Sequence, residues 1–74
     1  MNEDRYRVVL IDGAGQAESW LSPRLKTTNA AWEAGEFSWA EAKDLARFAG
    51  KHIKGYPAWY RWHVVPVAVA EVVA

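Results

Sequence analysis

Cysteine is absent from this chain of 74 residues, which excludes disulfide bonds, thiolate nucleophiles and thiolate metal ligands. The first four residues are polar or charged apart from Met1, unlike a secretory leader, so we expect a reducing cytoplasm. The longest apolar run covers residues 64–70, far short of the roughly 20 residues that span a bilayer. These absences favour a soluble protein with no membrane partner.

The chain also has no net charge, since its nine Lys and Arg residues balance its nine Asp and Glu residues. Residues 1–44 carry eight acids and five bases, whereas residues 45–74 carry four bases and one acid. This balance argues against a protein held to nucleic acid by its overall charge, but it leaves a local basic face open. The length predicts a single domain over residues 1–74, with residues 1–4 and about 68–74 as candidates for disorder.

Hydrophobic periodicity predicts a small α+β domain of ββαβ order. Alternating, β-branched residues indicate strands over 5–11, over 17–22 and from 59 onward. A capping box, Ser38 followed by Glu41, predicts the main helix over 38–50, with Gly50 ending it. A short helical turn is expected at about 29–34.

The expected sheet has three antiparallel strands in spatial order 2-1-3, because every connection stays short in that arrangement. Residues 12–15 (Asp-Gly-Ala-Gly) form the hairpin turn and lack the further glycine and the helix of a dinucleotide-binding loop. One helix covers one face only. We therefore expect the other face to present Val9 and Ile11 to solvent, together with Val65 and Trp59, as a patch that signals a partner.

Catalytic, metal and cofactor sites are not indicated, and we expect no enzymatic activity. His52 and His63 are the only imidazoles, and no further ligands stand at matching spacing. A domain of this size is also expected to be too small to enclose a substrate pocket of roughly 300 Å³ or more.

Residues 51–63 interleave large aromatics with cations and contain no acid. Such a segment suits a protein-binding surface, where Trp, Tyr and Arg are enriched. It equally suits single-stranded nucleic acid, with aromatic rings stacking on bases and cations on phosphates. The nucleic-acid alternative assigns Lys51, Lys54, Tyr56, Trp59 and Arg61 to the contact.

Five tryptophans are also more than so short a chain can easily hide. We therefore expect at least one of them to be partly exposed.

Three phrases of the sequence look like a loose pattern: Ser-Trp-Leu-Ser at 19–22, Glu-Phe-Ser-Trp-Ala-Glu-Ala at 36–42, and His-Val-Val-Pro-Val at 63–67. The pattern is similar to small uncharacterised proteins carried by bacteria, phages and prophages. The resemblance implies the ββαβ arrangement and transfers no active site. By analogy it implies a protein that acts by binding a host protein.

The leading hypothesis is a non-enzymatic interaction module that binds or inhibits a protein through the helix-free face of the sheet. Its contact residues are expected to be Trp59, Arg61 and His63, with Val9 and Ile11 beside them. Tyr60 and Trp62 are expected to fill the core. A structural homodimer that uses the same face is the other alternative, beside nucleic-acid binding.

Overall fold

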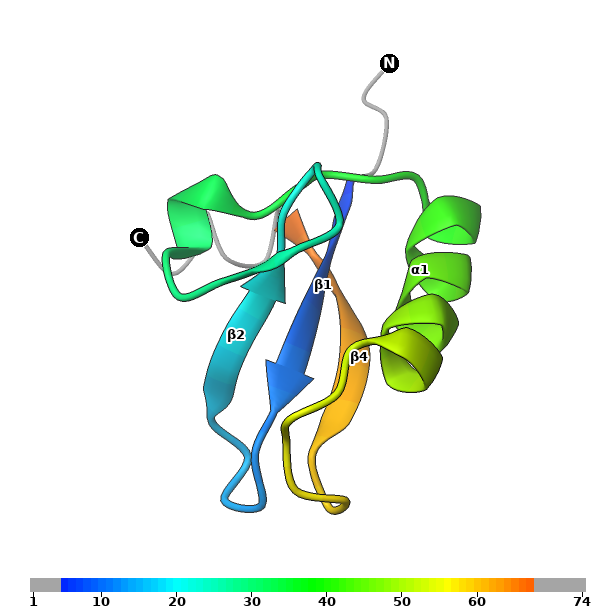
Figure 1. The fold of residues 1–74 in the computed structure, drawn as a ribbon. Helices are drawn as coiled ribbons and strands as arrows, with labels where there is room; N and C mark the ends of the chain where they lie inside the picture. The colour runs from blue at the N-terminus through cyan, green and yellow to red at the C-terminus, as the bar shows by residue number, and fades with distance from the viewer. Residues whose placement is uncertain (1–4, 68–74) are drawn as a thin grey trace.

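The computed structural model describes residues 5–67 and shows one helix packed on an antiparallel sheet (Figure 1). The elements in chain order are β1 (Tyr6–Ile11), β2 (Ala17–Leu21), β3 (Thr27–Thr28), the 3-10 turn η1 (Ala31–Glu33), α1 (Trp39–His52) and β4 (Arg61–Pro66). The strands lie in the order β3-β2-β1-β4, and α1 packs against β4 and β1. The predictions of disorder for 1–4 and 68–74 fall outside the described residues.

The predicted sheet of three strands was wrong by one strand, because residues 27 and 28 turn back and pair with β2. Ser22 causes this return: its Oγ accepts from the amides of Arg24 and Lys26, at 3.3 and 3.2 Å. Its own amide donates to the Lys26 carbonyl at 2.8 Å, and Leu25 takes a positive φ of 63° inside the turn. Serine and threonine hydroxyls form such local turns, which hydrophobic periodicity does not reveal.

Strand β1 is central, as the predicted order 2-1-3 requires, and both of its faces are covered. Val8, Val9 and Leu10 are at most 1% exposed. The expectation that Val9 faces solvent was therefore wrong. Val9 stands opposite Trp20 on one side and His63 on the other, and large neighbours at the same register cover a small central side chain. Ile11, at the strand end, is half-buried.

The capping box forms as predicted at the start of α1. Ser38 Oγ accepts from the Glu41 amide at 3.2 Å, and the Ser38 amide donates to Glu41 Oε1 at 3.2 Å. The predicted end at Gly50 was too early. The helix continues to His52, because a glycine weakens a helix by about 1 kcal/mol without breaking its hydrogen bonds.

The core lies between α1 and the sheet and centres on Val8, Leu21 and Ala42, each fully buried. Trp62 packs against this cluster, which confirms its predicted core position. The other partly buried residues that surround the cluster are Tyr6, Phe37, Leu45, Ala46, Ile53 and Val64. Within the described part of the chain, no helix is long and apolar enough to cross a membrane.

Candidate functional site

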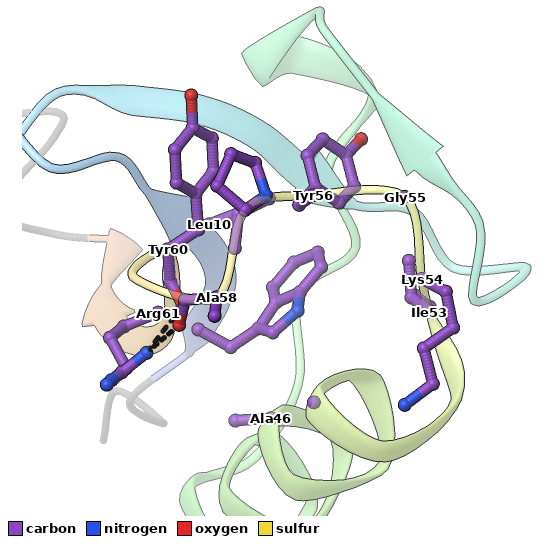
Figure 2. A pocket seen from close by; sticks show the side chains of 12 residues that line it. Leu10, Ala46, Ile53, Lys54, Gly55, Tyr56, Ala58, Tyr60 and Arg61 are labelled. Atoms are coloured by element: carbon purple, nitrogen blue, oxygen red, sulfur yellow. Dashed lines mark hydrogen bonds between the residues drawn. The ribbon is translucent and has the colours of Figure 1, made fainter.

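A pocket of about 380 Å³ opens where the chain leaves α1 and loops back to begin β4. Its walls come from the last turns of α1, from the loop over residues 53–60 and from the adjoining ends of β1 and β4 (Figure 2). The lining residues are Leu10, Ala46, Gly50, Ile53, Lys54, Gly55, Tyr56, Pro57, Ala58, Tyr60, Arg61 and Trp62.

The chain was expected to be too small to enclose a pocket of roughly 300 Å³. The hollow beside the loop between α1 and β4 reaches that size, but it is open to solvent rather than enclosed (Figure 2). The lining contains the cations Lys54 and Arg61 and no acid or histidine. Among residues 5–67, no three His, Asp or Glu side chains gather in a way that could hold a metal ion.

Three aromatic rings of the loop pack in series. Tyr56 stacks on Tyr60 with ring centroids 6.0 Å apart and an interplanar angle of 25°. Trp59 meets Tyr60 edge to face at 6.4 Å and 66°. Both are favourable aromatic geometries, each contributing about 0.5–1.5 kcal/mol beyond burial. The loop therefore presents a packed aromatic surface, although it contains no regular secondary structure.

Three polar contacts hold this loop in place. The Tyr56 hydroxyl lies 3.3 Å from Oγ of Ser19, a residue of β2 that is 1% exposed. The guanidinium of Arg61 donates through Nη1 to the carbonyls of Ala58 and Tyr60. Arg61, the first residue of β4, thus fixes the C-terminal end of the loop. Tyr56 attaches the N-terminal half of the loop to β2.

Trp59 is 66% exposed, yet its ring lies against the β1–β2 hairpin. A Cβ at Gly13 would lie 3.0 Å from Trp59 Cδ1, closer than nearly all real contacts. The hairpin is itself ordered, since Asp12 Oδ1 accepts from the amides of Ala14 and Gln16, both at 2.9 Å. The indole therefore combines solvent exposure with a defined position.

The strand residues that were predicted to bind a protein are neighbours across β1 and β4, but they differ in solvent exposure. Arg61 stands opposite Ile11 and His63 opposite Val9 in the β1–β4 register. Arg61 and His63 are exposed, whereas Val9 is buried and contributes only as support. Trp59 lies before β4 rather than in it, so the loop and not strand alternation sets its direction.

The residues assigned to nucleic acid are divided by the fold. Lys54, Tyr56 and Arg61 share the pocket lining. Lys51 lies in the last turn of α1 and Trp59 on the hairpin side, and neither lines the pocket. Tyr60, expected in the core, lines the pocket and packs with the loop aromatics instead.

One strongly exposed aromatic, Trp32, is not among the predicted contact residues; it is 84% exposed in η1. That turn has no buried residue, and a turn of three residues cannot form a buried face. Trp39, the first residue of α1, is 52% exposed and packs beside Tyr6 with Lys43 over its ring. The expectation of exposed tryptophan is confirmed.

Comparison with protein-family models, with curated proteins and with solved structures found no match to this chain.

Proposed function

We propose that this protein is a non-catalytic protein-interaction module whose contact surface is the 53–60 loop together with Arg61 and His63. The observation that carries the proposal is the exposed but well-positioned indole of Trp59. A large aromatic ring held in place loses little conformational entropy on binding, which is why Trp dominates many interface hot spots.

Charge supports a partner surface that is apolar at its centre and acidic around it. Residues 45–67 contain no acid, and Lys54 and Arg61 stand at the pocket beside Tyr56 and Tyr60. Cations beside aromatic rings favour carboxylates on the partner and steer its approach. As part of the same proposal, the protein acts in a reducing compartment as a phage or prophage accessory factor that occupies a host protein.

A pull-down with matched variants tests the proposal. Tagged wild-type protein is expected to retain a stoichiometric partner from nuclease-treated lysate. Trp59→Ala is expected to weaken retention about 30-fold, the effect of roughly 2 kcal/mol at a hot spot. Trp32→Ala is the matched control, because Trp32 is the more exposed ring and lies in η1, at the other end of the sheet (Figure 1).

Equal retention by wild type and Trp59→Ala, with both folded, would contradict this surface. Circular dichroism and thermal unfolding establish that each variant keeps the fold. Because the nuclease step removes bridging nucleic acid, a partner that survives it is bound by protein contacts.

Single-stranded nucleic acid is a second candidate, favoured by the meeting of Lys54, Tyr56 and Arg61 at one acid-free pocket. Stacking on Tyr56 with phosphates on the two cations is the expected mode. Fluorescence anisotropy with a labelled oligonucleotide tests it. Affinity is expected to fall steeply as salt is added, because salt reduces the gain from counterion release, and a flat titration at low salt would exclude it.

A further inference from the structure

The outer edge of β4 carries backbone groups whose direction follows from two sets of hydrogen bonds. The Val67 amide donates to the Arg5 carbonyl at 2.9 Å, and Tyr6 exchanges two 2.8 Å bonds with Phe37 on the opposite side. Neighbouring residues of an antiparallel strand alternate in direction. In the β1–β4 register, the N–H and C=O groups of Arg61, His63 and Val65 therefore point toward β1.

It follows that the N–H and C=O groups of Trp62 and Val64 point outward. Within residues 5–67, β4 is the outer strand of the sheet, and no hydrogen bond outside the β1–β4 ladder uses these groups. Pro66, the last residue of β4, has no N–H to offer. The edge thus presents two donors and two acceptors in alternation at Trp62 and Val64, the pattern that an added strand requires.

Charge indicates what this edge would accept. Arg61 and His63 are exposed on the helix-free face of β4. The nearby cation Arg7, opposite Val65, already has a carboxylate, since its Nη2 lies 3.6 Å from Glu36 Oε2. Opposite charges on adjacent strands stabilise pairing, so a strand beside β4 would favour acids at the positions next to Arg61 and His63.

We propose that the outer edge of β4 binds an extended acidic segment of a partner protein as an additional strand, with carboxylates beside Arg61 and His63. This inference rests on the proposed function and specifies how the partner is bound. A second copy of the chain is disfavoured as the occupant, because β4 contains no acid and a paired β4 would offer Arg61 no carboxylate.

Amide hydrogen exchange with a defined probe tests the proposal. The probe is an alternating Glu-Val octapeptide, and the control peptide alternates Lys and Val. In the free protein we expect the Trp62 and Val64 amides to exchange faster than those of His63 and Val65. At about ten times its dissociation constant, the acidic peptide is expected to slow Trp62 and Val64 about tenfold by occupying the edge.

Three results would overturn the proposal. The first is protection of the Trp62 and Val64 amides in the free protein, because the edge would then already be occupied. Protection that increases with protein concentration would identify self-association as the cause. The second is an acidic peptide that leaves both amides unprotected at saturating, millimolar-range concentration. The third is equal protection by the Lys-Val peptide, because the pairing would then not depend on charge.

Variants separate this inference from the proposed function. Val64→Pro removes the outward N–H of residue 64 and also changes the side chain that packs on the core. Val64→Ala changes that side chain too but keeps the N–H. Of these two variants, we expect only Val64→Pro to abolish the protection of the Trp62 amide by the acidic peptide. We expect His63→Glu to weaken binding of this peptide severalfold, and His63→Gln to weaken it less. If Val64→Pro does not fold, the exchange experiment on the wild-type protein still decides.

A partner that is lost with Trp59→Ala but retained with a folded Val64→Pro would uphold the interaction module and refute the added strand. The opposite result is also informative. If the acidic peptide protects the β4 amides while Trp59→Ala still retains the partner, the added strand is upheld and the contact surface built on Trp59 is refuted.

Discussion

The indole of Trp59 lies on Gly13, with only 3.0 Å between Trp59 Cδ1 and the place where a Cβ of residue 13 would stand. This contact joins the hairpin after β1 to the loop before β4, two segments far apart in the sequence. It places the most exposed aromatic of the loop against an ordered turn. The absence of a side chain at Gly13 is what permits the approach.

Gly13→Ala is expected to displace the Trp59 ring by a few tenths of an ångström and to weaken partner binding more than it weakens the fold. The added methyl meets Cδ1 at 3.0 Å and Nε1 at 3.3 Å. Fluorine NMR of protein labelled with 5-fluorotryptophan, with the Trp59 resonance assigned through Trp59→Phe, measures the displacement.

Gly15→Ala is the matched control for that substitution. Gly15 has φ of 83° and nothing within 4 Å of its added methyl, so alanine there costs about 1–2 kcal/mol of backbone strain and leaves the ring in place. A Trp59 resonance that shifts equally in both variants would show that the hairpin as a whole, and not the methyl at residue 13, determines the ring position.

Ala42→Leu is expected to destabilise the protein by about 1–3 kcal/mol through overpacking. Ala42 is fully buried in the cluster with Val8 and Leu21, so three more carbons would press on these neighbours. Ala40→Leu places the same side chain on the exposed side of α1 and is expected to change stability by less than about 0.5 kcal/mol. Urea unfolding followed by circular dichroism compares the two, and equal midpoints would contradict the packing of α1 on the sheet.

Ser38→Ala removes the side-chain cap of α1 and is expected to lower the free energy of unfolding by about 1 kcal/mol. Glu41→Gln keeps an oxygen that can accept from the Ser38 amide, so its effect is expected to be smaller. Thermal unfolding monitored at the helical band measures both. A larger loss from Glu41→Gln than from Ser38→Ala would mean that charge, not the hydroxyl cap, stabilises the helix start.

Tyr56→Phe removes the hydroxyl that contacts Ser19 and leaves the buried Ser19 Oγ without that partner. We expect a loss of about 1 kcal/mol and a more mobile 53–60 loop, seen as faster amide exchange at Tyr60. Tyr60→Phe is the control, since no hydrogen bond of its hydroxyl occurs among the described residues. A double-mutant cycle with Ser19→Ala isolates the pair, and additive losses would show that the two hydroxyls do not interact.

Local chemistry predicted much of the fold because each signal acts over a few residues. Ser38 and Glu41 meet within one helical turn, and the glycines after Asp12 close a hairpin between adjacent strands. The β-branched pattern of β1 likewise indicated a strand, and the predicted order 2-1-3 placed it at the centre of the sheet. The short β3 was not predicted, because its pairing depends on how Ser22 folds the turn before it.

Exposure at the candidate site could not be predicted from alternation. Trp59 and Tyr60 were assigned to a strand, but the chain is still a loop there, and Pro57 and Arg61 shape it through carbonyl contacts. Val9 was assigned to an open face, but its cross-strand neighbours Trp20 and His63 flank it on both sides. Both outcomes depend on residues distant in sequence.

Local sequence patterns specify the α+β class, the capped helix, the hairpin and the concentration of aromatics and cations in residues 51–63. These follow from backbone propensities and side-chain periodicity, which act between near neighbours. Tertiary contacts place part of this segment around a pocket, set Trp59 on Gly13 and make β4 the outer strand of the sheet within residues 5–67. Packing brings distant segments together, and the burial of a side chain depends on which segments those are.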